Sequence, residues 1–556
     1  MRRIASFIVV GVGLLASNGA YAQTCTSSNV DHLVTDARRE FRVSSVNDGS
    51  LSGVTDVEFQ RGAAMAAATW NEQSNSRPFF YNGLTSRTDL PSSKADCDSA
   101  GINYSLVKVD ATSNASAKGS ASGRCTDGNG NATQFLIKVN KKTSSGSDRV
   151  WEANGSTIGS NEYDLLQTLT HEFGHTLHLG HPSGEYGTMR GTSIGTNKQR
   201  DLYLWDLTCV KDLSQAPPER ATKIKRLYHS GGTFGSESTP FGGWIQSKGS
   251  PGITWVTGST EFSAAAKQTS STSTIWWTRG HNQSNTFNFP TSESSRDLIG
   301  MFTETTFRED TNQDRVFWVR PEEYPTPLDD DSSHRIRYRR SSNGFSSSNS
   351  GNLKECNSMT GFLSCSSHSY IQSGKPPAIS WDYEVDRTVF AWVNQNRDDN
   401  SDSREIRIAI GYVDNFILPV ATKTGIQSNV TPGIACRTNQ ADGHNCLMAY
   451  VDQRDGEQRI KLRRFTPVAT STGYSLVWHP STTTFTAAST ASRIALWYHD
   501  SRWWMAYRTN SPGQWMQVFH SMDSLTWSAL TPPSYTDVGP VAISYWAGNN
   551  TLFFAE

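Results

Sequence analysis

The spacing of hydrophobic residues changes near residue 215 and divides the chain into two regions. In the first, Thr55 and Glu58 open an Ala-rich stretch that runs to about Trp70, and their spacing suits the free N–H groups at the start of a helix. Three later segments have β-branched or alternating apolar residues between polar clusters and predict strands: Phe79 to Tyr81, Ile102 to Val109 and Phe135 to Val139. We therefore expect helices and strands together in this region.

Two more helices are predicted in the first region. Ser160 is placed to cap the first of them, with Glu162 and Asp164 in its first turn, and Gly180 and Pro182 are placed to end it. Its apolar stripe consists of Leu166, Leu169, Phe173 and Leu177. Apolar residues at helical spacing predict the other helix over 202–213, and the segment 216–222, rich in Pro and polar residues, predicts a linker.

From residue 223 to 556 helical spacing disappears, and short apolar runs alternate with polar turns. Similar segments recur at spacings of 58, 57 and 48 residues, beginning at Phe390, Met448, Met505 and Phe553. Three or four strands in every 45–60 residues are typical of β-propeller blades. We predict a propeller of about five blades, with a pair of β-sandwiches as the alternative.

Charge and composition narrow the choice of partner. The chain has 51 Lys and Arg against 52 Asp and Glu, so it lacks the positive field that holds a nucleic acid. Hydrophobic residues make up 36% of the chain, which is enough for a sizeable core. Nucleic acid is not expected as a partner.

The N-terminus has the pattern of a signal peptide. Arg2 and Arg3 precede an apolar run from Ile4 to Ala16, and Ala20-Tyr21-Ala22 is a small-x-small cleavage site. The run is shorter than the roughly 20 residues that span a bilayer, and no other run approaches that length. We predict cleavage after Ala22, a secreted or periplasmic protein, and no membrane span.

Eight cysteines remain after residue 22, four in each region. An even number in an exported protein predicts disulfides, and the equal division supports a domain boundary. Cys356 with Cys365 and Cys436 with Cys446 are close enough in sequence to form local pairs, while Cys25 pairs with Cys209 in one arrangement.

The strongest motif is the segment from His171 to His181, HEFGHTLHLGH. Residues at i and i+4 share one helix face, so His171 and His175 can bind one Zn²⁺ while Glu172 borders the same side. If the helix stops at Gly180, His181 supplies the third ligand and a fourth position stays open for water, whose proton Glu172 accepts. His178 is an alternative third ligand, although a straight helix places it about 10.5 Å along the axis from His171.

This motif resembles the signature of the metzincin zinc proteases, H-E-x-x-H-x-x-G-x-x-H followed by a methionine turn. The preceding residues 161–170 and the spacing to Met189 resemble the matrixin branch. The resemblance implies an α+β metzincin-like domain over 23–215, with His171, His175 and His181 as zinc ligands, Glu172 as general base and Met189 beneath the metal. It further implies a secreted zinc endopeptidase that acts on protein substrates, and we expect a monomer.

His178 stands where the family has a glycine that permits the sharp exit from the helix. Histidine tolerates positive φ better than most residues but at a cost, and Gly180 is an alternative place for the turn. The replacement of this glycine by His178 leaves open whether the zinc centre is catalytic or structural.

Weaker motifs occur in turns. A D-x-N-x-D spacing suits Ca²⁺ at two places, Asp310-Asn312-Asp314 and Asp398-Asn400-Asp402, although solvated hairpin tips have the same composition. Residues 521–527 resemble the Asp-box turn of sialidase-type propellers, with one residue missing.

Two other functions fit the same sequence. In one, the second region carries the main function, and the protein binds or hydrolyses glycans. In the other, the protein is a catalytically silent adhesion module with a structural zinc, which His178 in place of glycine favours.

Overall fold

The computed structural model describes residues 39–45, 50–73, 79–114, 116–153, 159–181, 188–191 and 206, together with strands and adjoining turns between 224 and 555. The predicted signal peptide, the linker, Cys25 and Cys209 lie outside the described residues. The domain boundaries and the export signal therefore stay predictions.

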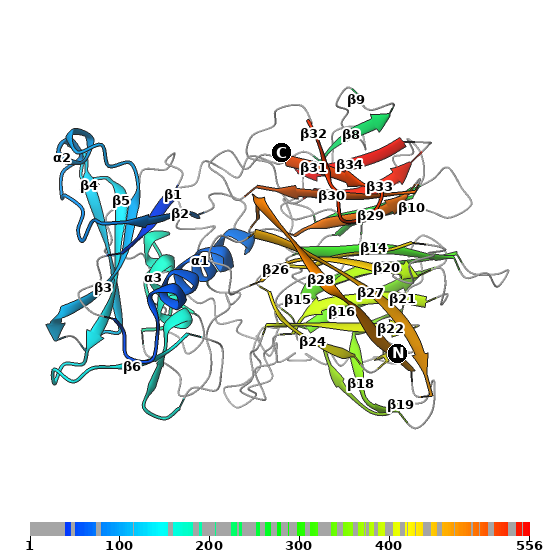
Figure 1. The fold of residues 1–556 in the computed structure, drawn as a ribbon, viewed down its shortest axis with the longest axis horizontal. Helices are drawn as coiled ribbons and strands as arrows, with labels where there is room; N and C mark the ends of the chain where they lie inside the picture. Colours follow the sequence, from blue (N-terminus) through cyan, green and yellow to red (C-terminus); the bar gives the residue numbers. More distant parts are fainter. Residues whose placement is uncertain are drawn as a thin grey trace, which may run out of the picture.

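Residues 39–191 form a five-stranded sheet with two long helices on it (Figure 1). The order is β2-β1-β3-β5-β4, in which only β4 is antiparallel to its neighbour. β4 is an edge strand. The bounds are β1 (Arg39–Ser44), α1 (Asp56–Gln73), β2 (Phe79–Thr85), β3 (Ser105–Asn114), β4 (Gly119–Thr126), β5 (Ala132–Lys142) and α3 (Leu165–Thr176).

Smaller elements complete this part of the chain: α2 (Lys94–Ser99), β6 (Val150–Glu152) and β7 (Glu162–Asp164). A disulfide joins Cys97 of α2 to Cys125 of β4. β6 and β7 pair in parallel and hold the segment that leads into α3.

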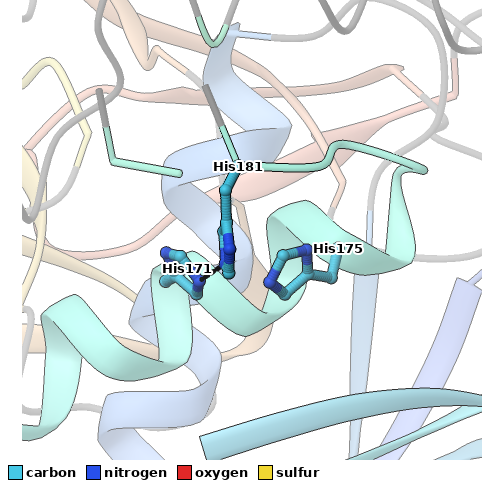
Figure 2. A group of neighbouring side chains, drawn as sticks. All are labelled: His171, His175 and His181. Atoms are coloured by element: carbon cyan, nitrogen blue, oxygen red, sulfur yellow. Dashed lines mark hydrogen bonds between the residues drawn. The ribbon is translucent and has the colours of Figure 1, made fainter. Parts of the chain in front are cut away.

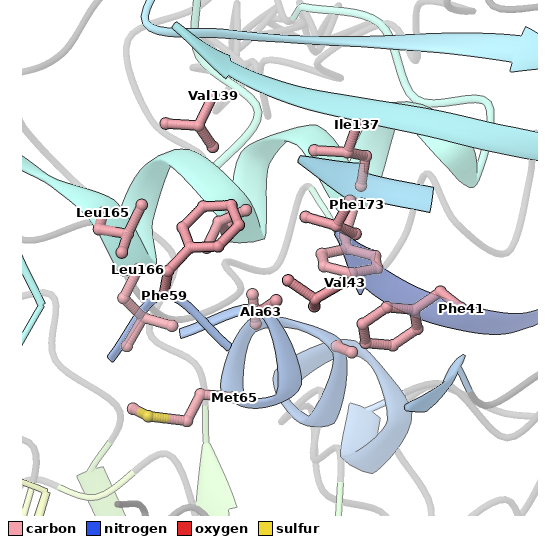
Figure 3. Packing of buried hydrophobic residues seen from close by; sticks show 14 of the residues in the cluster. Phe41, Val43, Phe59, Ala63, Met65, Ile137, Val139, Leu165, Leu166 and Phe173 are labelled. Atoms are coloured by element: carbon pink, nitrogen blue, oxygen red, sulfur yellow. The ribbon is translucent and has the colours of Figure 1, made fainter. Parts of the chain in front are cut away.

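The core lies between the sheet and the two helices (Figure 3). Phe173 of α3 packs edge-on against Phe41, Phe79 and Phe135, which come from three different strands. α3 approaches α1 closely at Gly62, where a Cβ atom would lie 3.3 Å from the Leu165 side chain. Burial of these aromatic rings fixes the side of α3 that faces away from solvent.

The first helix begins as predicted, and the second does not. Thr55 and Glu58 exchange hydrogen bonds at the start of α1, with Thr55 N–H donating to Oε2 at 2.8 Å. For α3, Asp164 rather than Ser160 is the capping residue, because its carboxylate accepts from the Gln167 N–H at 2.9 Å. Residues 162–164 form β7 instead of a first helical turn.

Six antiparallel sheets of four strands follow. The first three are β10 (Gly252–Trp255), β11 (Phe262–Lys267), β12 (Ile275–Arg279) and β13 (Phe287–Asn288); β14 (Asp297–Thr305), β15 (Asn312–Arg320), β16 (Arg335–Ser341) and β17 (Asn349–Asn352); and β20 (Ala378–Asp382), β21 (Arg387–Val393), β22 (Glu405–Gly411) and β24 (Thr422–Gln427).

The other three are β25 (Gly433–Cys436), β26 (Cys446–Val451), β27 (Arg459–Thr470) and β28 (Gly473–Ser489); β29 (Ala495–His499), β30 (Arg502–Arg508), β31 (Met516–Ser521) and β32 (Ser528–Leu530); and β33 (Val541–Trp546), β34 (Asn549–Ala555), β8 (Ile224–Ser230) and β9 (Thr233–Phe234). An additional small sheet contains β18 (Lys354–Met359), β19 (Cys365–Tyr370) and β23 (Ile417–Leu418).

The six sheets close into a ring and form a β-propeller. Their first strands contact one another in the order β10, β14, β20, β25, β29 and β33, and β33 contacts β10 again. The sixth sheet combines the last two strands of the chain with β8 and β9, which precede the first sheet. Because the first strands of residues 223–556 pair with the last ones in this sheet, their pairing closes the ring.

This architecture corrects two predictions. The described strands make six blades rather than about five, and the β-sandwich alternative is wrong because the ring is closed. All four recurring segments fall on the second strand of a blade: β21, β26, β30 and β34. Two blades lack this segment, so the repeat undercounted them. The chain is mostly β, with three α-helices among the described residues, and an α+β metzincin-like class is not supported.

Apolar residues of neighbouring blades interlock. One cluster joins Ile408 of the third blade to Met448 of the fourth, and another joins Leu447 of the fourth to Met505 of the fifth. The predicted disulfides Cys356–Cys365 and Cys436–Cys446 are confirmed. In the part of the chain that the structure describes, no helix is long and apolar enough to cross a membrane.

Candidate metal centre

Three histidines converge at the end of α3 (Figure 2). His171 and His175 are one turn apart on the helix face opposite the aromatic core. α3 ends at Thr176, and His178 takes a left-handed conformation with φ +69°. The chain then turns back and brings His181 beside the other two rings. The turn is therefore at His178 itself, not at Gly180.

The distances suit a shared ion. One ring nitrogen from each histidine lies within 4.8 Å of the other two, and His171 Nε2 is 3.0 Å from His181 Nε2. Two nitrogens that each lie 2.0–2.1 Å from a tetrahedral ion are about 3.3 Å apart. His178 does not belong to this group.

Backbone carbonyls orient two of the rings. His171 Nδ1 lies 2.8 Å from the Thr188 carbonyl oxygen, and His175 Nδ1 lies 2.7 Å from that of Leu179. Since a carbonyl can only accept, each Nδ1 carries the proton, and each Nε2 presents a lone pair. Hydrogen bonds of this kind fix a histidine in the form that binds a metal.

Burial keeps the histidines neutral. It lowers the pKa of His171 to about 3, with a further contribution from His175, and it lowers the pKa of His175 to about 4. The pKa of His181 is also lowered by burial. Three neutral imidazoles with aligned nitrogens are a donor set that suits zinc, so the residues present fit this ion.

Glu172 lies against the centre in an apolar setting. Burial raises the pKa of its carboxyl group to about 8, and the described structure gives Oε2 no hydrogen-bond partner. On its other side is β4, where a Cβ atom on Gly119 would lie 2.8 Å from Glu172 Oε1. A glycine is therefore needed for the edge strand to pass this close to the carboxylate.

Met189 is buried against Gly174 of α3 and follows Thr188, whose carbonyl group contacts His171. A Cβ atom on Gly174 would lie 2.1 Å from Met189 Sδ, so this helix position must be a glycine. Asp206 holds the methionine turn, since its carboxylate accepts from the N–H groups of Thr188 and Met189 at 2.9 and 3.1 Å. Asp206 was not identified from the sequence, where only the apolar positions of its predicted helix carried a signal.

A cleft of about 580 Å³ opens onto the histidines. One wall is the edge strand β4 and the residues that lead into it. The described residues that line the opposite side are Gln167, Thr168, His171, Glu172, His175, His181, Arg190 and Gly191. The centre is thus accessible to a ligand along the edge strand β4.

Of the six candidate calcium ligands, Asn312 and Asp314 lie within the described residues. Asn312 and Asp314 lie on β15, paired with neighbouring strands, which is unlike a calcium loop. Asp310, Asp398, Asn400 and Asp402 lie outside the described residues. In the Asp-box-like turn, Asp523 Oδ1 accepts from the N–H groups of Leu525 and Thr526, so its role is to hold the turn.

No family model matches the chain, and no curated protein matches it. Among solved structures, the Aleuria aurantia lectin in complex with α-methyl-L-fucoside has 11% identity and a TM-score of 0.33, over 55% of this chain and 86% of the lectin. An α-L-arabinofuranosidase from Fusarium graminearum has 9% identity and a TM-score of 0.33, over 55% of this chain and 92% of that one. A GH62 α-L-arabinofuranosidase from Coprinopsis cinerea has 9% identity and a TM-score of 0.27, over 48% of this chain and 93% of that one. At these TM-scores the likeness assigns no activity to this chain.

The comparisons contradict the assignment to the matrixins. The matching structures named above are a lectin and glycoside hydrolases rather than metzincin proteases, and no protease family model matches. The endopeptidase activity and the protein substrates inferred from that assignment are therefore not retained. An eleven-residue motif reports the local donor geometry of a three-histidine centre; it does not fix the family or the bond that is cleaved.

Proposed function

We propose that the protein binds one zinc ion through His171, His175 and His181 and uses this centre for hydrolysis at a carbonyl carbon. The observation that supports this best is the convergence of three imidazoles, two of them oriented by backbone carbonyls, beside a buried carboxyl group in an open cleft. Three protein ligands leave a position open, which is the pattern of catalytic rather than structural zinc. We also propose that the protein is exported, from the N-terminal sequence.

When bound, zinc supplies Lewis acidity that makes water a nucleophile near neutral pH. Glu172 accepts the proton of the attacking water and returns it to the leaving group. Glu172 is held for this task by Gly119 on one side and by its own helix on the other. The carbonyls of Thr188 and Leu179 keep the rings of His171 and His175 in place throughout.

The test begins with metal binding. We expect calorimetric titration of the full chain to give one zinc per molecule, and His175→Ala to abolish binding. The zinc-loaded protein is then incubated with a fluorogenic library in which an ester or an amide bond is flanked by groups of different charge. Chelator-sensitive turnover that is lost in Glu172→Ala, with zinc retained, supports the proposal.

Zinc binding by a folded protein without turnover of any member would favour a structural zinc. Absence of zinc binding would overturn the centre itself.

A second candidate function, glycan binding by the propeller, is favoured by Tyr370 at the end of β19. Its side chain is 40% exposed, Lys354 Nζ lies 5.2 Å from its ring centre, and His368 Nε2 lies 3.1 Å from the same ammonium group. An exposed aromatic ring beside polar donors suits a sugar ring. We expect Tyr370→Ala in the full chain to lower binding to a glycan array, whereas Val477→Ala, also exposed on the propeller, leaves binding unchanged.

A further inference from the structure

The cleft beside the three histidines has an excess of positive charge. Among its described lining residues, Lys118, Arg124 and Arg190 are cationic, and Glu172 is the only carboxylate. Asp89, which does not line the cleft, lies 3.9 Å from Arg124 Nε and offsets that charge, so the excess comes from Lys118 and Arg190. A bound metal ion would add to this charge. Clefts lined by one sign of charge raise the local concentration of ligands of the opposite sign.

Among these cations, Lys118 lies where the wall of the cleft comes close to Glu172. It directly precedes Gly119, which faces Glu172. Its Nζ lies 5.4 Å from the ring centre of Tyr163, just before α3 begins, and Gln167 and Thr168 of the first turns of α3 line the same cleft. Lys118 therefore marks the end of the cleft beside the start of α3.

The backbone around Lys118 is held by buried groups. Asn140 N–H donates to the Lys118 carbonyl oxygen at 2.9 Å, and Asn140 Nδ2 donates to that of Ala117 at 3.0 Å. Arg149 Nη2 donates to the Ser116 carbonyl oxygen at 3.1 Å. Both Asn140 and Arg149 are buried, so the base of the Lys118 side chain has a fixed position.

The ammonium group of Lys118 is incompletely solvated. Burial lowers the pKa of Lys118, an effect that Asp164 opposes and Arg149 reinforces. A partly desolvated cation gains more from an anionic partner than a fully exposed one does.

We propose that Lys118 forms a subsite for an anionic group, so that the protein acts preferentially on substrates that carry a carboxylate or similar group close to the cleaved bond, toward the start of α3. The inference rests on the proposed function, because it assumes that the substrate's carbonyl group lies at the histidines. Ser116 to Lys118 and the first turns of α3 form the walls of this subsite.

The test uses zinc-chelating probes with and without an added carboxylate. Acetohydroxamic acid has no charge beyond its chelating group. The monohydroxamates of succinic, glutaric and adipic acid carry a carboxylate at three different distances from the chelating group. Binding of each probe to the zinc-loaded full chain is measured by calorimetry, with zinc content determined after each titration. We expect at least one anionic probe to bind roughly tenfold more tightly than acetohydroxamate.

Variants locate the effect. In Lys118→Met the two kinds of probe should bind with similar affinity, and in Lys118→Glu the anionic probes should bind more weakly than acetohydroxamate. Lys141→Met is the matched control, because Lys141 lies outside the cleft, 3.6 Å from Asp148, and it should keep the wild-type preference.

The outcomes separate the two proposals. Equal affinity for all probes in the wild type would overturn the anionic subsite while leaving the metal centre in place. A preference that persists in Lys118→Met would overturn the role of Lys118. A chain that holds no zinc and binds no hydroxamate would overturn the proposed function on which the inference rests.

Discussion

At the scale of single residues, His178 occupies a left-handed backbone position that normally favours glycine. The helix must end sharply for His181 to reach the other histidines, and the residue at the turn has φ +69°. The sequence identified this position and its cost, but Gly180, two residues later, offered an equally plausible turn. In the structure, His175 Nδ1 donates to the Leu179 carbonyl oxygen and the Leu179 N–H group donates to that of Gly174, so the turn is fixed before Gly180.

Two substitutions isolate the cost of this turn. His178→Gly and His178→Ala remove the same side-chain contacts, but only glycine relieves the left-handed backbone. We therefore expect the glycine variant to have a free energy of unfolding about 1 kcal/mol higher than the alanine variant, measured by urea denaturation. Both should bind zinc as the wild type does. Loss of zinc in both would mean that His178 is a ligand after all.

Glu172 predicts a dependence of stability on pH in the metal-free protein. Its pKa in the folded chain, about 8, lies above the ordinary value of 4.5, so ionisation favours the unfolded state as pH rises between these values. Glu172→Gln cannot ionise. We expect it to be more stable than the wild type at pH 7.5, by a few kcal/mol at most at about 1.4 kcal/mol per pKa unit, and nearly equal at pH 4.5.

Thermal unfolding at the two pH values, with a chelator present, measures this difference. Comparison with the wild type at each pH cancels the opposite effect of the histidines, whose low pKa values destabilise the fold on acidification. A gap that is the same at both pH values would show that the carboxyl group is not buried as described.

At the scale of elements, the spacing of residues predicted the features of helices that depend on close neighbours in sequence. It did not predict the features that depend on pairing with a distant strand. The capping box at Thr55 and the stripe on α3 were readable, because each depends on residues three or four positions apart. The start of α3 was not, because residues 162–164 pair with β6, which no local pattern reveals. The zinc motif needed only helical spacing, whereas Asp206 reaches the centre from 17 residues beyond Met189.

The edge strand β4 should control the position of the Glu172 carboxylate. In Gly119→Ala the new methyl group would lie within 3 Å of the Glu172 side chain, which must then shift. We expect turnover of the best library substrate to fall by roughly 10- to 100-fold, with zinc affinity unchanged, because displacement of a reacting group by about 1 Å has effects of this size. Gly128→Ala, in the turn after β4 with open space around it, is the control. Equal turnover in both variants would contradict this role.

At the scale of the whole molecule, ring closure depends on residues more than 300 positions apart. β8 begins at Ile224 and pairs with β34 at the end of the chain, so the sixth blade forms only when both ends are in place. The recurring segment at Phe553 lies on β34 of this blade, but it does not reveal that β8 and β9 complete the sheet. The count of recurring segments fell below six because the first two blades lack the segment.

Because the ring is closed by β8, we expect a substitution at one buried residue of this strand to destabilise the whole propeller without affecting zinc binding. Leu227 is fully buried against Val541 and Ile543 of the last blade, and Leu227→Asp would place a charge there at a cost of several kcal/mol. We expect the propeller to lose protection from hydrogen exchange in every blade, because each sheet is covered by its neighbours, while residues 39–191 still bind one zinc. Val468→Asp, at a half-exposed position on β27, should change neither property. If Leu227→Asp also abolished zinc binding, the two regions would form one cooperative unit, and the domain boundary predicted at 216–222 would be wrong.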